Sequence, residues 1–246
     1  MGFFLSRFLH EVVFPMGSHY MRVPLYNRKP VKIAVLIPDR NDRPLFLKNC
    51  LRMLEAQTLK PDHIELVNDV PLNDNCDITY RYRIGYERLR NKRFDIIAFI
   101  ENDDWYSPAY LETMVNKWIE LGKPDLLGTN YTIYYHLKLE SYFTMKHDSR
   151  ASAMNTLIKP DLNFPWCVDH EPYTDLHLWV RSGLNGIVFK PEQHISIGIK
   201  HGVGLTGGFC HTGKLDRYKE NGVELIKQTM DKESFDFYFN YFNNEV

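Results

Sequence analysis

The sequence predicts an α/β domain whose mixed, mostly parallel sheet is flanked by helices. Short runs rich in β-branched and aromatic residues alternate with helical patterns along the chain, as in sheets whose strands are joined by crossover helices. Two runs, 31–37 and 94–100, are nearly continuous in apolar residues, which is typical of strands buried on both faces. The length of 246 residues suits one domain with appendages.

The predicted elements follow one another in a regular order. The strand at 31–37 ends at Pro38, and a helix follows over 44–54, with Asp42 as its cap and Pro44 in its first turn. Further strands are predicted at 63–67, 94–100 and 126–135, and one or two short strands within 187–199. Further helices are predicted at 80–93, 108–119, 174–182 and over the last 30 or so residues.

Composition excludes several classes of protein. The 30 Lys and Arg residues balance 31 Asp and Glu residues, so no global attraction to nucleic acid or anionic lipid exists, although a local patch remains possible. The four cysteines are scattered without a CxxC pair, which argues against a zinc knuckle or a disulfide scaffold and favours a reducing cytoplasm. No apolar run reaches the roughly 18 residues of a membrane-spanning helix.

An acidic cluster follows the strand at 94–100 directly. Glu101, Asp103 and Asp104 fall within four positions, and open α/β sheets bind ligands at the carboxyl ends of their strands. Period-two alternation places Glu101 and Asp103 on one face. Mutually repelling carboxylates in a cleft suit a divalent cation, which prefers oxygen ligands. Asp104 has an alternative interpretation as the cap of the next helix.

Four motifs in order resemble the GT-A-fold glycosyltransferases of family 2. They are the opening strand with Pro38 and Asn41, the segment 51–69, the acidic run 99–104 with its DxD-like pattern, and the helix 174–181. The resemblance implies a GT-A (Rossmann-like) single domain. It also implies a metal-dependent, inverting transfer of a sugar from a nucleotide-sugar donor to an acceptor hydroxyl, with release of a nucleoside diphosphate.

The sequence departs from the family pattern at several positions. Glu101 replaces the first acid of DxD, Asn68 replaces an Asp that often contacts the nucleobase, and Thr174 replaces the Glu before the catalytic Asp. An amide accepts a hydrogen bond from uracil or donates one to cytosine, so the base of the donor stays open.

The resemblance assigns roles to residues at the matching positions. Asp175 corresponds to the general base, although an Asp at a helix start also serves as a cap. Asp103, with Glu101, would hold Mn²⁺ or Mg²⁺ at the diphosphate. His201 and His211 are candidates for a late metal ligand. Residues expected at the donor are Pro38, Asn41, Asn68, Asp69, Arg81, Arg83, Asn102 and Lys200, the last of these in a glycine-rich segment of the kind that cradles phosphates. Those expected at the acceptor are Trp166, Tyr173 and His177.

We therefore divide the chain into three parts. Residues 1–30 form an N-terminal extension whose Phe4, Phe8 and Val12 share one helical stripe, either a docking segment or partly a tag remnant. Residues 31–213 form the catalytic domain, with a nucleotide-sugar half at 31–135 and an acceptor half at 136–213. Residues 214–246 form a helical, aromatic tail.

Two other functions remain open. The basic, aromatic stretch 80–93 would suit a phage-type enzyme that glycosylates 5-hydroxymethylcytosine in DNA, in the cytoplasm of an infected host cell. The second alternative is a nucleotidyltransferase or a non-catalytic nucleotide-sugar-binding domain. The turn 38–41 contains no glycine, which disfavours a nucleotidyltransferase, whose phosphate loop is glycine-rich.

Overall fold

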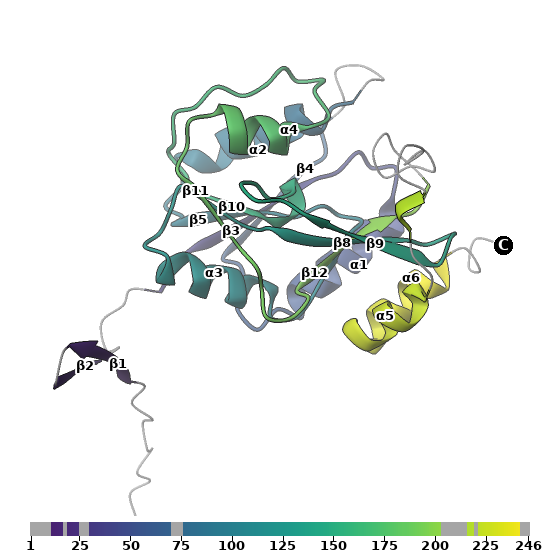
Figure 1. Cartoon of the computed structure of the whole chain (residues 1–246). Coiled ribbons are helices and arrows are strands. Elements are labelled where there is room, and N and C mark those ends of the chain that lie inside the picture. Colours follow the sequence, from purple (N-terminus) through teal and green to yellow (C-terminus); the bar gives the residue numbers. More distant parts are fainter. Residues whose placement is uncertain are drawn as a thin grey trace, which may run out of the picture. The chain divides into compact units, whose positions relative to one another are not determined.

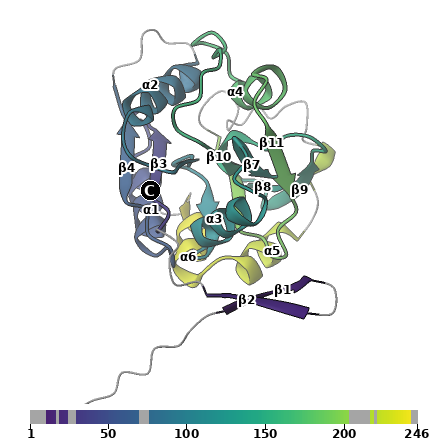
Figure 2. The same ribbon diagram turned by 90° about the vertical axis from the view of Figure 1, so that its left-hand side faces the viewer.

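The structure is a computed structural model, and it describes residues 11–16, 19–24, 30–69, 76–202, 216–218 and 221–241. The chain divides into two units, Met1–Val31 and Lys32–Val246. In the first unit, strand β1 (Glu11–Met16) pairs antiparallel with strand β2 (His19–Pro24), as Figure 2 shows.

The helical stripe predicted for Phe4, Phe8 and Val12 is wrong where the structure describes it. Residues 11–16 form a strand, and Phe4 and Phe8 lie outside the described residues. Val12 and its neighbours are β-branched or aromatic and favour an extended backbone. Pro15 also interrupts any helix that reaches it.

A six-stranded sheet forms the centre of the second unit (Figure 1). Its strands are β3 (Ile33–Pro38), β4 (His63–Val67), β5 (Ile96–Phe99), β7 (Leu126–Thr129), β10 (Thr156–Ile158) and β11 (Gly186–Phe189). The strand order is β11-β7-β10-β5-β3-β4. Strand β3 is parallel to β4 and β5, and β11 is parallel to β7, whereas β10 runs antiparallel between β5 and β7. The predicted mixed, mostly parallel sheet is confirmed.

Helices cover both faces of this sheet (Figure 1). They are α1 (Pro44–Glu55), α2 (Ile78–Arg90), α3 (Tyr110–Glu120) and the short α4 (Thr174–Leu176), which continues into a π-helical turn (His177–Arg181). One core cluster joins Tyr82 and Tyr86 of α2 and Trp179 of the π turn to the sheet residues Leu36 and Phe99. Helix α2 and the segment that begins at α4 therefore share one face of the sheet, while α3 covers the other.

A second, four-stranded sheet has the order β6-β12-β8-β9. Its strands are β6 (Trp105–Tyr106), β8 (Tyr131–His136), β9 (Ser141–Lys146) and β12 (Ser196–Lys200). Strand β12 is parallel to β8 and antiparallel to β6. Since β6 follows the acidic run 101–104 directly, this pairing brings β12 to the acidic turn. Among the described residues, the end of the chain forms helices α5 (Gly222–Thr229) and α6 (Lys232–Phe239).

Several local predictions are wrong. The N-cap of α1 is Arg43, without a side-chain cap bond, and Asp42 instead accepts from Arg43. Asp104 does not cap α3, which begins only at Tyr110; its Oδ1 accepts from the Ile199 amide at 2.7 Å. The stretch 126–135 forms two strands in different sheets, because the chain turns at 130. Strands β9 and β10 were not predicted.

Gly128 in β7 permits a close approach that a larger residue would prevent. A Cβ atom at this position would lie 2.3 Å from the Ala151 Cβ and 2.8 Å from both the Asn155 carbonyl oxygen and a ring carbon of Trp179. Two of these neighbours are backbone or a buried ring, so they cannot move aside cheaply.

We predict that Gly128→Ala lowers the free energy of unfolding by about 1–3 kcal/mol, as overpacked core positions do. Urea titration followed by circular dichroism measures this. Gly122→Asn is the control, because no atom lies within 4 Å of a Cβ there and its φ of +78° is one that Asn tolerates. Equal stability of Gly128→Ala and the unsubstituted protein would contradict the packing argument.

Candidate active site

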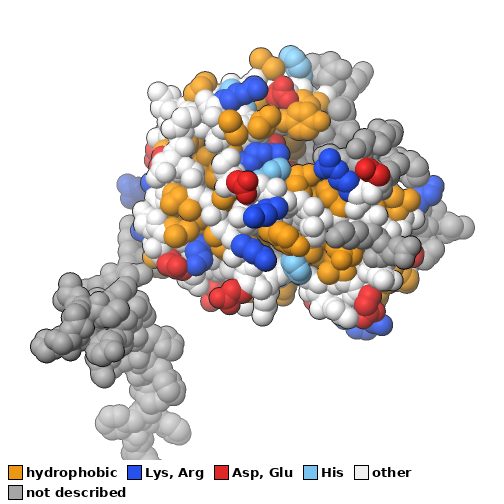
Figure 3. All heavy atoms as spheres, viewed as in Figure 1, with side chains coloured by type: hydrophobic (Ala, Val, Ile, Leu, Met, Phe, Trp, Pro, Cys, Tyr) orange, Lys and Arg blue, Asp and Glu red, His pale blue; other side chains and the backbone are white. Residues whose placement is uncertain are grey.

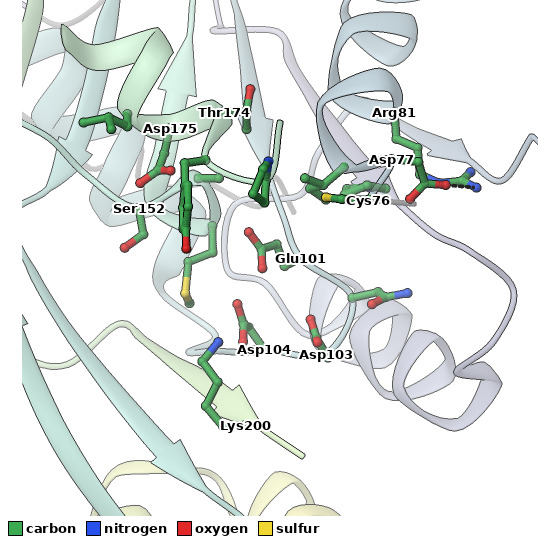
Figure 4. A pocket seen from close by; sticks show the side chains of 18 of the residues that line it. Cys76, Asp77, Arg81, Glu101, Asp103, Asp104, Ser152, Thr174, Asp175 and Lys200 are labelled. Atoms are coloured by element: carbon green, nitrogen blue, oxygen red, sulfur yellow. Dashed lines mark hydrogen bonds and ion pairs between the residues drawn. The ribbon is translucent and has the colours of Figure 1, made fainter. Parts of the chain in front are cut away.

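A cavity of about 510 Å³ lies at the carboxyl ends of β3 and β5. The acidic turn after β5 lines one part of it, the start of α2 another, and the segment that begins α4 a third. Figure 4 shows Glu101, Asp103, Asp104 and Lys200 together, with Asp175 facing them from a separate segment of the chain. Parallel strands bring their carboxyl ends to one edge, which is why segments distant in sequence meet here.

The acidic cluster is held by bonds from the turn to neighbouring elements. One ligand oxygen each from Glu101, Asp103 and Asp104 lies within 4.8 Å of the others. Asn102 Nδ2 donates to Asp39 Oδ1 at 2.7 Å, which ties the turn to the end of β3. The Glu101 amide donates to the Tyr106 hydroxyl at 2.9 Å. The turn is therefore fixed although its carboxylates repel one another.

Asp103 is the carboxylate of the cluster that contacts an arginine and a histidine. Its Oδ2 accepts from Arg43 Nη1 and lies 2.8 Å from His201 Nε2. Burial opposes ionisation of Asp103, but the Arg43 charge and the His201 bond outweigh it and hold the pKa well below the usual range. Asp103 is thus an anion at neutral pH.

The pKa values of Glu101 and Asp104 are shifted in the opposite direction, upward. Burial, and then the charge of Asp103, raises the pKa of Glu101 to about 7. Burial likewise raises the pKa of Asp104, with further contributions from both neighbouring carboxylates. Asp104 Oδ2 is buried and has no hydrogen-bond partner among the described residues. The closely spaced carboxylates of Glu101, Asp103 and Asp104 form a donor set that fits Mn²⁺ or Mg²⁺, because a divalent cation would relieve their repulsion.

Asp175 lies in the first turn of α4 and lines the same cavity. Arg150 Nη1 donates to Asp175 Oδ2. Burial raises the pKa of Asp175 above its ordinary value, and the Arg150 charge opposes that rise. A carboxylate whose pKa is raised by burial can accept a proton near neutral pH more readily than an ordinary aspartate.

The structure brings many of the predicted residues together. Those that line the cavity are Pro38, Arg81, Glu101, Asn102, Asp103, Tyr173, Asp175 and Lys200. His201 reaches the cluster through its contact with Asp103. The guanidinium of Arg81 is buried and binds Asp77 and the Val67 carbonyl oxygen. His211 lies outside the described residues.

Other predicted residues do not line the cavity. Asn41 donates to the Asn68 carbonyl oxygen at 3.2 Å, and Asp69 pairs with Arg88. These three residues therefore tie the loops at the strand ends to one another or to α2. Asn68 is itself exposed.

Three further residues predicted at the donor or acceptor make contacts elsewhere. Arg83 forms a two-bond fork with Asp169, at 2.8 and 2.7 Å. Trp166 packs edge-on against Tyr86 at the border of the core. His177 Nε2 lies 3.0 Å from the Pro165 carbonyl oxygen. The structure thus places Arg83, Trp166 and His177 where they hold the segment 159–173 against α2 and α4.

Sequence reasoning missed two arginines of the site. Arg43 ends the loop after β3, and Arg150 lies in a segment without a recognisable pattern. Arg43 could have been recognised from the sequence, because it is a basic residue two positions after Asn41 in the loop that follows the first strand of the sheet. No comparable signal marks Arg150, because its partner is 25 residues away in the chain.

Comparisons with known proteins show similarity to glycosyltransferases. No protein-family model matches the chain. Glycosyltransferase GlyA of Streptococcus pneumoniae is 26% identical over 143 residues, which are 48% of this chain. The putative glycosyltransferase EpsH of Bacillus subtilis is 31% identical over 104 residues, which are 35% of this chain. The matched segments span only 20% and 30% of those two proteins.

Among solved structures, S. aureus TarS 1–349 in complex with UDP-GlcNAc superposes with a TM-score of 0.50 at 11% sequence identity. That superposition covers 87% of this chain and 72% of the TarS chain. The predicted resemblance to GT-A-fold glycosyltransferases is confirmed by these similarities, and the fold is of that type. Within the described residues, no helix is both long and apolar enough to cross a membrane.

The segment 159–173 is attached to α2 by several bonds that involve no cavity residue. Besides the fork between Arg83 and Asp169, Thr79 Oγ1 donates to the Glu171 carbonyl oxygen at 2.6 Å. The Leu162 amide donates to the Tyr86 hydroxyl at 2.9 Å. This segment leads into α4, so its attachment determines where Asp175 lies.

We predict that Asp169→Asn speeds hydrogen exchange of the amides in segment 159–173. The global free energy of unfolding should change by less than about 1 kcal/mol, because the ion pair is partly exposed. Hydrogen exchange read by mass spectrometry measures the effect. Lys117→Gln, which breaks an ion pair on α3, is the matched control and should leave this segment unchanged. Unaltered exchange in Asp169→Asn would show that the fork does not hold the segment.

Proposed function

We propose that the chain is a metal-dependent, inverting glycosyltransferase that moves a sugar from a nucleotide-sugar donor to an acceptor hydroxyl. The observation that carries this proposal is the position of Asp175 across one cavity from the acidic turn that bears Glu101 and Asp103. A leaving group and an attacking hydroxyl need opposite sides of the anomeric carbon. Cation-binding acids on one side and a base on the other supply that arrangement.

The acidic turn is the proposed site of the donor diphosphate. Glu101, Asp103 and His201 would hold Mn²⁺ or Mg²⁺, which when bound supplies positive charge to the leaving diphosphate. Lys200 lines the cavity beside these acids, and its ammonium lies 4.8 Å from the centre of the Tyr134 ring. We assign it to a diphosphate oxygen, where its charge would be stabilising.

Asp175 is the proposed general base. Its carboxylate accepts the proton of the acceptor hydroxyl as that oxygen attacks the sugar, which inverts the anomeric carbon. Arg150 is a positioning residue, because its bond to Oδ2 restrains the orientation of the Asp175 carboxylate. Tyr173 lines the cavity with 57% of its surface exposed, which suits a platform on which an acceptor sugar stacks.

The donor is inferred from a similar structure, and the acceptor class from the exposed aromatic side chain of the cavity. The TarS structure contains UDP-GlcNAc, so UDP-sugars are the first donors that we would examine. A glycan is the acceptor class that an exposed aromatic platform favours. The basic stretch 80–93 gives no support to a DNA acceptor: five of its basic side chains, Arg81, Arg83, Arg88, Arg90 and Lys92, pair with carboxylates. Charges of both signs are also interspersed over the face in Figure 3.

The donor is tested by thermal unfolding with a panel of nucleotide sugars, each with and without Mn²⁺. A ligand that binds the folded state raises the melting temperature, and we expect one nucleotide sugar to do so more strongly with Mn²⁺. Release of the nucleoside diphosphate on addition of candidate glycans then identifies the acceptor. A melting temperature that no nucleotide sugar changes would contradict the proposal.

Two substitutions separate binding from chemistry. Asp175→Asn should retain metal-dependent nucleotide binding and lower kcat by about 100-fold or more, as loss of a general base does. Asp103→Asn should instead abolish metal-dependent binding. Calorimetric titration with UDP and Mn²⁺, beside steady-state kinetics, measures both. Normal turnover in Asp175→Asn would reject its assignment as the base.

The pH dependence of kcat/KM should report the environment of Asp175. The base works when deprotonated, so activity falls as pH drops through its pKa in the folded protein, which burial raises above the ordinary value. Arg150 opposes that rise, so Arg150→Gln should move the acid limb to higher pH. Lys146→Gln, which removes an exposed lysine paired with Asp148, is the control and should leave the limb in place. An acid limb unmoved by Arg150→Gln would contradict this coupling.

A further inference from the structure

Arg43 meets Asp103 at the same oxygen atom that a cation would use. Arg43 Nη1 donates to Asp103 Oδ2 and lies 3.2 Å from His201 Nε2, which is itself 2.8 Å from that oxygen. Of the three side chains, Arg43 is 18% exposed, Asp103 11% and His201 0%. The guanidinium thus bridges two of the side chains that we assign to the metal.

Arg43 and a divalent cation compete for this oxygen. The guanidinium donates to Asp103 Oδ2, and the His201 imidazole lies against the same atom. A divalent cation that used Oδ2 and His201 would lie a few ångströms from the guanidinium charge, in a partly buried site where water screens little. Occupancy of Asp103 Oδ2 by Arg43 therefore weakens its occupancy by the metal.

The donor offers Arg43 another partner. Arg43 lines the cavity, and a guanidinium fork matches the oxygens of a phosphate as well as those of a carboxylate. Arg43 Nε also donates to Asp42 Oδ1 at 3.3 Å, and the Asp42 side chain is 44% exposed. The side chain can therefore leave Asp103 without stranding a buried group, provided that an anion receives it.

We propose that Arg43 is a built-in competitor of the divalent cation for Asp103, and that the donor diphosphate removes this competition by binding Arg43 itself. This inference rests on the proposed function, because it takes Asp103 as a metal ligand. It makes metal and nucleoside diphosphate bind cooperatively: each should be held weakly alone and more tightly in the presence of the other. The enzyme would then avoid holding a metal without a donor.

The experiment measures Mn²⁺ binding to the whole chain by the electron paramagnetic resonance signal of free Mn²⁺, with and without UDP. Without UDP, Arg43→Gln should bind Mn²⁺ at least about tenfold more tightly than the unsubstituted protein, the effect expected for loss of one charged competitor. The factor by which UDP tightens Mn²⁺ binding should also become smaller in this variant. Circular dichroism and thermal melting establish that it folds.

Two matched variants separate competition from general charge effects. Lys200→Gln removes a positive charge from the same cavity, but its ammonium contacts the Tyr134 ring rather than bonding Asp103, so it should tighten Mn²⁺ binding much less. Arg90→Gln removes an arginine of α2 that pairs with Glu87 on the same helix, and it should change nothing.

The outcomes are distinguishable. Equal Mn²⁺ affinity of Arg43→Gln and the unsubstituted protein, or an equal gain in Lys200→Gln, would overturn the competition while leaving the metal site of the proposed function intact. Absence of Mn²⁺ binding from every variant, even with UDP, would overturn both. Should Arg43→Gln fail to fold, Arg43→Lys provides the test: a point charge without the fork should give an intermediate Mn²⁺ affinity, and an affinity equal to that of the unsubstituted protein would overturn the proposal.

Discussion

The hydrogen bond from Asn102 to Asp39 joins the carboxyl ends of two neighbouring parallel strands. It fixes the turn after β5, which carries three repelling carboxylates, to the neighbouring strand. Both partners are buried, with about 1% of their surface exposed, so the bond forms where water does not compete. Bonds from the Glu101 amide to Tyr106 and from the Ile199 amide to Asp104 join the same turn to β6 and β12.

Much of the fold was predictable because it follows local patterns. The strand at 63–67 agrees with β4 residue for residue, and the apolar runs at 31–37 and 94–100 correspond to β3 and β5. The acidic run was recognisable because three carboxylates after a buried strand are unusual. Strand β10 was not predicted, because its three residues, Thr156–Ile158, are too few to show the two-residue alternation of a strand.

The paired charges of the site were not predictable. Arg43 lies 60 residues from Asp103, and Arg83 lies 86 residues from Asp169, and no periodicity relates partners so far apart. In the basic stretch 80–93, three side chains, Arg83, Arg88 and Lys92, pair with carboxylates distant in the sequence. Arg81 and Arg90 pair with acids four and three residues away. Which charges stay unpaired is a property of tertiary structure.

Helix α6 contacts the backbone of the acidic turn. The Tyr238 hydroxyl donates to the Asp103 carbonyl oxygen at 3.4 Å, and Asp231 accepts from the Trp105 indole. These partners are separated by 135 and 126 residues, so a ribosome completes the turn long before it synthesises the helix that supports it. During that interval the sheet can assemble, but the acidic turn that bears Asp103 lacks its contacts with α6. The acidic turn can therefore reach its final packing only after α6 has been synthesised.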